Sequence, residues 1–405
     1  MIYKKLLEKR QQKKSGKKRR GNLSLKQLNI KAFAEKIKCR AESDIKENNI
    51  CGVSIAVINP DETLYKAHFG TLSAEDKSPL NDSTLFRMAS MTKPVTAVAI
   101  MALYDKGLID LDDPVLKYLP QFMDRYIVKM TDGRVEKVCK AKTQLTVRHL
   151  LTHTSGLLAG ECGTVYAKAL SVEANKSLKG TVDYYSSVGL SFEPYTKNEY
   201  SPTAAFDVLA RIVEVISDTD YAEFVTKYIT DPCGMTDTVF VPDNEQWQRI
   251  IPMHTKENGK SGVFEMKEGC VFENVPVTHY LGGAGLISSL DDYTSFAKML
   301  LNKGEINGNR VISEKAVKLI STPQVPESIM PGNERWGLGV RVITSENYRY
   351  LPVGTFGWSG AYGTHFWIDP VNSIAAVYME NSMYDGGSGA VTAANFEKDV
   401  FNSFN

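Results

Sequence analysis

The sequence predicts an α+β fold in which one β-sheet is assembled from both ends of the chain and a helical region is inserted between them. A run rich in β-branched residues occurs near the N-terminus, at 52–60, and strand-like runs bounded by turn residues occur near the C-terminus, at 364–369 and 373–380. Between them, roughly from 116 to 275, helical patterns alternate with polar stretches. With 405 residues, of which 43% are hydrophobic, the chain can form one large or two medium-sized domains.

The first part of the sheet domain is predicted to run helix, strand, turn, strand. The run 52–60 ends in Asn-Pro-Asp, which is typical of a strand followed by a turn, and the alternating residues 63–71 predict its hairpin partner. The preceding helix, within residues 27–48, is predicted from apolar residues at helical spacing, namely Leu28, Ile30, Phe33, Ile37 and Ala41.

The C-terminal part is predicted to begin with a helix after the Gly-rich segment at 282–285. Ser289 is a suitable N-cap, and Asp291 and Asp292 lie in the first turn, where a helix favours negative charge. Strands are then predicted at 336–343, 364–369 and 373–380, followed by a helix near 388–402. The polar stretches 131–144 and 171–182 are predicted to separate helices of the inserted region.

These elements predict a discontinuous sheet domain, 21–115 and 276–405, a mainly helical domain, 116–275, and a basic tail, 1–20. The tail holds ten of the 48 basic residues and one of the 47 acidic residues, so the rest of the chain is mildly acidic. Such a tail could bind nucleic acid or an anionic membrane. Because it carries no interleaved aromatic residues and no nucleic-acid motif, we expect a solvated, disordered tail and no nucleic-acid partner.

Several classes of protein are disfavoured by the composition. No apolar run reaches about 18 residues and the N-terminus lacks the core of a signal peptide, so we expect no membrane span and a cytoplasmic location. The six cysteines form no C-x-x-C pair, which favours reduced thiols. His149 and His153 have i, i+4 spacing but lack the H-E-x-x-H pattern, so we expect neither a metal nor another cofactor.

A candidate nucleophile lies in the segment 85–107. Apolar residues predict a mostly buried helix from Ser90 to Lys106, with Gly107 as its stop, and Pro94 is tolerated only if the helix starts close to Ser90. Lys93 is then on the same face as Ser90. A serine hydroxyl becomes a nucleophile when a neighbouring amine, kept neutral by burial, accepts its proton. Of four S-x-x-K instances, only this one coincides with a helix start inside an apolar segment.

Two further segments could complete such a site. Tyr200-Ser201-Pro202 stands directly before a predicted helix, and a phenol at such a junction can project into a cleft and move a proton. In the segment 356–370, Gly357, Gly360 and Gly363 precede a strand-like run, and an edge strand of this kind can present backbone amides to an oxyanion.

Together these three segments resemble the boxes of the serine β-lactamase and penicillin-binding protein superfamily, in its class C-like branch that includes family VIII carboxylesterases. Ser90-Met91-Thr92-Lys93 matches the S-x-x-K box, Tyr200-Ser201-Pro202 falls at the Tyr-x-Asn box, and Trp358-Ser359-Gly360 falls at the Lys/His-Thr-Gly or Trp-x-Gly box. The similarity extends from about residue 45 to the C-terminus. It also includes the connecting segments 108–122, 145–157 and 282–301.

The resemblance implies a mainly antiparallel sheet flanked by helices, a separate helical domain and an acyl-enzyme mechanism. Ser90 would attack a carbonyl group, Lys93 and Tyr200 would share the base and acid roles, and the amides of Ser90 and Ala361 would form the oxyanion hole. The third box, Trp358, Ser359 and Gly360, would bind the substrate, a small acyl compound. How Lys93 and Tyr200 divide the proton is left open by the residues.

Two departures from the family pattern bear on the substrate. Trp358 stands where β-lactam-processing members place a cation, and Pro202 stands where they have an asparagine. Both changes favour less polar acyl groups, so we expect a serine hydrolase acting on small esters, with amide or weak β-lactam turnover also open. The alternatives are an acyltransferase using the same acyl-enzyme, a D-amino-acid or peptidoglycan-type peptidase, and a penicillin-binding sensor without turnover.

Overall fold

The computed structural model of the chain describes residues 30–47, 49–171, 174–264, 279–346, 348 and 350–404. The predicted basic tail, 1–20, and Cys270 lie outside these residues. The other five cysteines, Cys39, Cys51, Cys139, Cys162 and Cys233, are free thiols, as predicted. Among the described helices, none has the length and apolar character needed to cross a bilayer.

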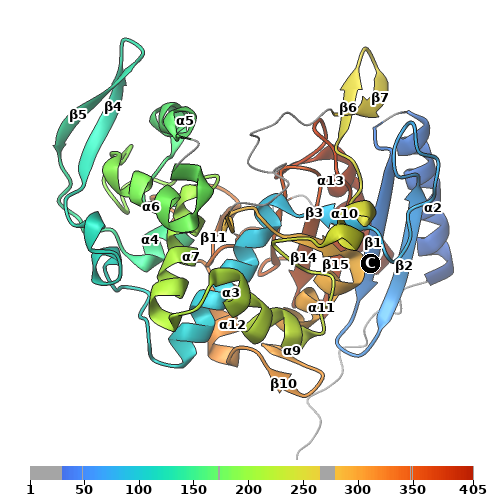
Figure 1. The fold of residues 1–405 in the computed structure, drawn as a ribbon. Helices are drawn as coiled ribbons and strands as arrows, with labels where there is room; N and C mark the ends of the chain where they lie inside the picture. The colour runs from blue at the N-terminus through green and yellow to red at the C-terminus, as the bar shows by residue number, and fades with distance from the viewer. Residues whose placement is uncertain are drawn as a thin grey trace, which may run out of the picture.

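A seven-stranded antiparallel sheet forms the centre of the fold (Figure 1). Its strand order is β11-β12-β13-β14-β15-β1-β2, so the N-terminal hairpin pairs with the last strand of the chain. The predicted sheet built from both ends of the chain is therefore confirmed. The strands are β1 (Gly52–Ile58), β2 (Thr63–Gly70), β11 (Glu334–Trp336), β12 (Arg341–Ile343), β13 (Phe356–Ser359), β14 (His365–Asp369) and β15 (Ile374–Met379).

Helices cover both faces of this sheet, and β1, β14 and β15 are therefore buried along their whole length. Alternate side chains of β1 enter two different apolar clusters. Val53, Ile55 and Val57 pack with the terminal helices α2 (Ile30–Lys46) and α13 (Val391–Phe404). Ala56 and Ile58 face the larger cluster with α3 (Thr92–Asp105) and α11 (Leu290–Leu301). In Figure 1, α2 lies beside β1 and β2.

Most of the remaining elements lie between β2 and β11 in the sequence, and their longest helix is α7 (Ala204–Ser217). The other helices are α4 (Val147–Leu151), α5 (Gly160–Ala169), α6 (Leu178–Ser187), α8 (Tyr221–Val225), α9 (Asp231–Cys233), α10 (Asn244–Arg249) and α12 (Glu314–Ile320). The short strands are β3 (Leu85–Arg87) paired with β8 (Ile287–Ser289), β4 (Tyr126–Thr131) with β5 (Arg134–Lys140), β6 (His254–Glu257) with β7 (Lys260–Val263), and β9 (Glu305–Ile306) with β10 (Asn309–Arg310). The boundaries of the two domains stay a prediction.

The local signals for helix ends are confirmed. Ser289 caps α11 by accepting a hydrogen bond from the Asp292 amide at 3.2 Å. Gly107 follows α3 with a φ of 69°, the left-handed conformation that glycine adopts without strain at a helix end.

Three segments differ from the prediction. Most of the polar stretch 131–144, up to Lys140, belongs to the β4–β5 hairpin, whose turn residues Asp132 and Gly133 have φ of 48° and 76°. Asp-Gly between alternating strands is a strong hairpin signal, so this element was recognisable. The stretch 171–182 includes the start of α6, which Ser177 caps. The expected strand 336–343 is two strands, because a turn at Gly339, with φ of 71°, separates β11 from β12.

Candidate active site

Ser90 lies in the turn between β3 and α3. One 3-10 turn, Ala89–Met91, leads into α3 at Thr92, so the predicted helix start near Ser90 is confirmed. Ala89 has a φ of 45°, a left-handed conformation that non-glycine residues rarely adopt. Backbone strain of this kind persists only where the surrounding structure fixes it, and it clusters at functional sites. The strain therefore marks this turn as a candidate active centre independently of the S-x-x-K pattern.

Lys93 is fully buried, one helical turn after Ser90. Its Nζ lies 3.1 Å from Ser90 Oγ and 2.5 and 2.8 Å from the carbonyl oxygens of Pro202 and Gly283. An ammonium group has three N–H bonds, which match these three acceptors. A neutral amine would donate to the two carbonyls and keep its lone pair toward Ser90. The geometry around Lys93 therefore suits both the neutral amine and the ammonium, the two states of a group that accepts a proton.

Tyr200 approaches Ser90 from the segment before α7. Its hydroxyl donates to Ser90 Oγ at 2.8 Å, and the centre of its ring lies 5.0 Å from Lys93 Nζ. The ring stacks on Trp336, with 15° between the planes, and contacts Trp358 at a centroid distance of 5.6 Å. Of the three residues predicted to perform the chemistry, Lys93 and Tyr200 are thus both within hydrogen-bonding distance of Ser90. Their catalytic roles stay a prediction.

Pro202 contributes its backbone to this arrangement. The family pattern has an asparagine side chain at this position, whereas here the Pro202 carbonyl accepts a hydrogen bond from Lys93. The anchor of the lysine at this box is therefore a main-chain carbonyl.

His153 is a buried residue of the site. From the sequence it was considered only as a metal ligand together with His149, and it was not placed at the Ser90 site. It packs against the rings of both Tyr200 and Trp336, at centroid distances of 4.5 and 4.4 Å. Its Nδ1 accepts a hydrogen bond from the Ser201 amide at 3.1 Å, so the ring is neutral with its proton on Nε2. Burial, with Lys93 nearby, holds the pKa of His153 well below its usual value. This neutral imidazole supports the ring of Tyr200. No periodic signal in the sequence marks it.

The two histidines at i, i+4 spacing do not form a joint site. The Nδ1 of His149 accepts from the Thr146 amide at 3.2 Å, as part of the cap of α4, while His153 faces the Tyr200 cluster. Burial lowers the pKa of His149 to about 4. Within the described part of the chain, no three His, Cys, Asp or Glu side chains are grouped so that they could hold a metal ion.

The third box lies on β13, beside the nucleophile turn. Gly360 follows this strand, and a Cβ at that position would lie 2.4 Å from the Met88 carbonyl oxygen and 2.1 Å from Thr364 Oγ1. The Thr364 hydroxyl donates to the same Met88 carbonyl at 3.1 Å. Because only glycine permits this approach, Gly360 brings the end of β13 against the turn that carries Ser90.

β13 is an interior strand at its beginning and has an open edge at its end. β12 pairs with Phe356 and Gly357, and its described residues make no pair with Trp358 or Ser359. The expected edge strand is therefore present only from Trp358 onward. In the described structure, neither the Ser90 amide nor the Ala361 amide donates to another protein group. Their role as an oxyanion hole stays a prediction.

Ser359 differs from its neighbour Trp358 in direction. Trp358 faces Tyr200, whereas the Ser359 hydroxyl is hydrogen-bonded to Nδ1 of His365 at 2.8 Å. Nε2 of His365 in turn lies 2.9 Å from Glu397 on α13, and Arg341 lies 3.3 Å from the same carboxylate. This buried network ties β13 to the C-terminal helix. A direct contact of Ser359 with substrate stays a prediction.

A cavity of about 740 Å³ opens beside Tyr200. Helix α5 contributes Gly160, Gly163 and Ala167, small residues at the i, i+3, i+7 spacing of one helix face. The other lining residues are Leu158, Glu161, Thr164, Lys168, Glu199, Tyr200, Pro202 and Thr203. The position of this cavity, next to the candidate proton-transfer group, makes it a candidate substrate pocket.

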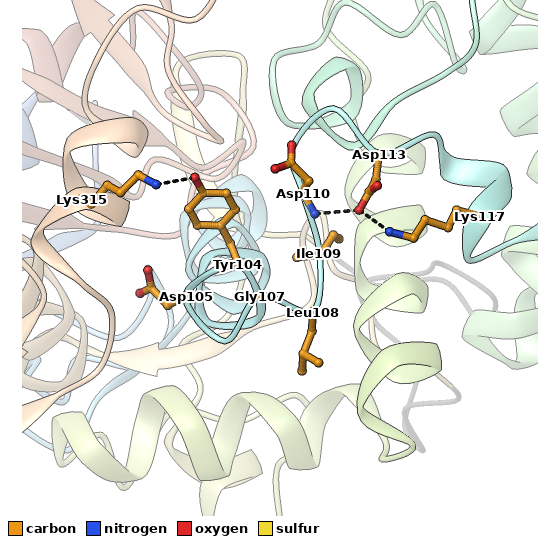
Figure 2. Close-up of a pocket in the computed structure, with 9 residues that line it drawn as sticks. All are labelled: Tyr104, Asp105, Gly107, Leu108, Ile109, Asp110, Asp113, Lys117 and Lys315. Atoms are coloured by element: carbon orange, nitrogen blue, oxygen red, sulfur yellow. Dashed lines mark hydrogen bonds and ion pairs between the residues drawn. The ribbon is translucent and has the colours of Figure 1, made fainter.

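A second cavity, of about 500 Å³, lies at the opposite end of α3 (Figure 2). Tyr104 and Gly107 line it, and α3 rises about 1.5 Å per residue, so it is more than 15 Å along the helix from Lys93. Its two lysines are bonded within the pocket: Lys315 donates to the Tyr104 hydroxyl at 2.8 Å, and Lys117 pairs with Asp113 at 2.9 Å. These contacts stabilise the surface and offer no group to the Ser90 site.

A family model described as Beta-lactamase matches residues 31–396 of the chain. The chain belongs to the beta-lactamase family. The match covers both the sheet and the helices around Ser90, and it confirms the predicted superfamily and the predicted α+β fold. This superfamily comprises serine hydrolases and acyltransferases.

Relatives of this beta-lactamase-family protein include enzymes and a protein named without an activity. Protein Rv1367c of Mycobacterium tuberculosis is 30% identical over 348 residues, covering 82% of this chain and 85% of that protein. Esterase EstB of Burkholderia gladioli is 28% identical over 398 residues, covering 91% and 95%. The solved structure of EstCE1, described as a hydrolase with promiscuous acyltransferase activity, has a TM-score of 0.77 at 21% identity and covers 93% of this chain and 100% of that one.

Proposed function

We propose that the protein is a serine hydrolase that acts on small ester substrates through an acyl-enzyme. One observation carries the proposal: Ser90 Oγ lies within hydrogen-bonding distance of both Lys93 Nζ and the Tyr200 hydroxyl. An amine and a phenol on one serine oxygen can remove its proton and return a proton to the leaving group.

In the acylation step, Ser90 Oγ attacks the ester carbonyl carbon as its proton passes to the Lys93 and Tyr200 pair. The carbonyl electron pair moves onto oxygen, where the amides of Ser90 and Ala361 would stabilise it. When this tetrahedral adduct collapses, the C–O bond to the alcohol breaks and the alcohol leaves with a proton from Tyr200. Attack of water on the acyl-enzyme reverses these transfers and frees Ser90.

The substrate preference follows from the groups around Ser90. Trp358 brings an aromatic surface and no positive charge to the third box, so a substrate carboxylate gains no ion pair from this residue. The cavity beside Tyr200 has small residues along α5 and can receive the alcohol or acyl part of an ester. We therefore propose uncharged carboxylic esters as the main substrates, with slower turnover of amides and β-lactams.

Acyl transfer is a second candidate, and the size of the same cavity supports it. About 740 Å³ accommodates an acceptor alcohol next to the phenol that would deprotonate it. EstCE1, which shares the fold, is described as having promiscuous acyltransferase activity. Turnover of an aryl ester with added alcohols, followed by quantification of acid and new ester, separates the two outcomes: a hydrolase forms mainly acid.

The proposal is tested by labelling the full-length protein with a fluorophosphonate and mapping the modified peptide. We expect one adduct, on Ser90, and loss of both labelling and aryl-ester turnover in Ser90→Ala. Ser295→Ala is the matched control, because Ser295 and Lys298 form an S-x-x-K pattern in the middle of α11. Labelling elsewhere, or turnover that survives Ser90→Ala, contradicts the proposal.

Exposure to a penicillin distinguishes the sensor alternative. A hydrolase loses the acyl adduct with time, as followed by intact-mass measurement, whereas a sensor keeps it. The cytoplasmic location stays a prediction, and with it the preference for an ester over a cell-wall peptide.

A further inference from the structure

Asp207 is a carboxylic acid enclosed in the core directly behind the candidate active site. It lies in the first turn of α7 and is fully buried. One carboxylate oxygen accepts the Gly283 amide at 3.1 Å, and the other accepts the Tyr185 hydroxyl at 3.4 Å. Within the described structure no cation makes an ion pair with it. A buried carboxyl without an ion pair is costly, so its presence calls for a reason.

Gly283 connects Asp207 to Lys93. The amide of Gly283 donates to Asp207, and the carbonyl of the same residue accepts from Lys93 Nζ at 2.8 Å. A Cβ on Gly283 would lie 2.9 Å from Thr203 Cα and 3.0 Å from the Thr203 carbonyl oxygen. Because no larger residue fits here, the backbone of Gly283 is held between the carboxyl group and the amine. Gly283 is thus the residue that links the Asp207 carboxyl group to the Lys93 amine.

The groups that face Asp207 come from three helices. Lys93 of α3 is the cation, and Tyr185 of α6 and Tyr221 of α8 are phenols whose pKa burial raises, so both stay protonated. Burial raises the pKa of Asp207 to about 7. The Gly283 amide, the charge of Lys93 and the Tyr185 hydroxyl act in the opposite direction and lower this pKa, but by less. Asp207 is therefore the carboxyl group at this site whose charge changes near neutral pH.

We propose that Asp207 is a positioning residue that, in its ionised form, stabilises the Lys93 ammonium during acylation, acting across Gly283. The proposal rests on the proposed function of Ser90 and adds a fourth residue to it. Whether Lys93 or Tyr200 takes the proton of Ser90, Lys93 carries a positive charge, as an ammonium group, during acylation. A carboxylate in the same low-dielectric region stabilises that cation without itself taking a proton.

During acylation, Ser90 Oγ loses its proton to the Lys93 and Tyr200 pair. At the same time the bond from Oγ to the carbonyl carbon forms, and the electron pair of the carbonyl double bond moves to its oxygen. The positive charge at Lys93 faces the ionised Asp207 through Gly283, and no bond to Asp207 forms or breaks. When Asp207 is protonated, this compensation is lost and the cation must form uncompensated in the core. The rate of acylation is then expected to follow the ionised fraction of Asp207.

The first test is the pH profile of kcat/KM for an aryl ester, measured with the full-length protein and with Asp207→Asn. In the unmodified protein we expect kcat/KM to rise with pH through about 7. Asparagine keeps an acceptor for the Gly283 amide and cannot ionise. We expect it to lower kcat by about 10- to 100-fold, with a smaller effect on KM, and to remove the rise near pH 7.

Tyr185→Phe is a second variant that keeps the carboxyl group. The phenol of Tyr185 lowers the pKa of Asp207, so removing it is expected to move the rising limb of the profile to higher pH. This shift does not depend on whether Asp207→Asn folds.

Asp292→Asn is the matched control, since Asp292 is also a buried carboxyl, on α11, bonded to the Thr238 hydroxyl at 2.9 Å. Its loss is expected to lower stability and leave the pH profile unchanged. An Asp207→Asn protein that keeps both its activity and the limb near pH 7, or a Tyr185→Phe limb that does not move, overturns the inference. Survival of activity in Ser90→Ala overturns the proposed function instead.

Discussion

The hydroxyl oxygens of Tyr200 and Ser90 lie 2.8 Å apart, although 110 residues separate the two in the chain. The phenol donates this hydrogen bond, and its ring is held between His153, Trp336 and Trp358. A side chain fixed by several rings has little freedom to leave the serine. The contact is therefore a built part of the site.

Removing the Tyr200 hydroxyl tests this contact. Tyr200→Phe keeps the stacked ring and loses the proton donor, so ester turnover is expected to fall by about 10²- to 10⁴-fold with little change in thermal stability. The measurement is kcat together with the melting temperature. Tyr195→Phe is the control, because the exposed Tyr195 bonds only distantly, to the Gln324 carbonyl at 3.4 Å. Equal activity in both variants would remove Tyr200 from the mechanism.

Gly360→Ala tests the approach of β13 to the nucleophile turn. The added Cβ meets the Met88 carbonyl at 2.4 Å, so β13 must move away from Ser90. Overpacking of this kind is expected to cost about 1–3 kcal/mol of unfolding free energy and to lower ester turnover more than tenfold. Urea unfolding and kcat/KM measure the two effects. Gly262→Ala, where the new Cβ would lie 3.7 Å from Thr255, should change neither quantity.

The His149→Gln variant tests whether the burial of His149 makes the stability of the fold depend on pH. The pKa of His149 is about 4 in the folded chain, below its ordinary value of 6.5, so at intermediate pH the unfolded chain binds more protons. Folding stability from this group is present above about pH 6.5 and is lost as the pH falls toward 4. Glutamine can still accept from the Thr146 amide in a capping box but does not titrate.

We therefore expect the variant to lose stability less steeply between pH 6.5 and 4, by up to about 1 kcal/mol per pH unit. Urea unfolding at pH 5 and pH 8 is the measurement, and the two proteins should be similar at pH 8. Parallel curves for both proteins would show that the burial of His149 has no linkage to folding.

Ala167→Trp tests the cavity beside Tyr200 as the substrate pocket. Ala167 lines it from α5, so an indole there fills space that a bulky ester would need. We expect acetate esters of small alcohols to keep their turnover within about twofold and esters of bulky groups to lose more than about tenfold. Ala169→Trp, on the same helix and not in the lining, is the control. A uniform loss on all esters would place the substrate elsewhere.

The sequence by itself determined the features that depend on local order. The β-branched residues at 52–60 marked β1, and strand-like runs bounded by turn residues marked β14 and β15. The Ser289 cap marked α11, and Pro94 marked the start of α3 beside Ser90. Each of these follows from the chemistry of a few consecutive residues. The strands of Glu334–Trp336 and Arg341–Ile343 were merged because a glycine turn carries the same apolar pattern as a strand.

Only the tertiary structure decided which distant groups meet. Packing of α7 on α3 and of β13 on the nucleophile turn places Tyr200 at Ser90, turns the Ser359 hydroxyl to His365, and buries Asp207 behind Lys93. The spacing of residues along the sequence does not show these contacts, since they depend on how separate helices and strands pack. The pKa of Asp207 depends in turn on its burial, and burial is a property of the folded chain alone.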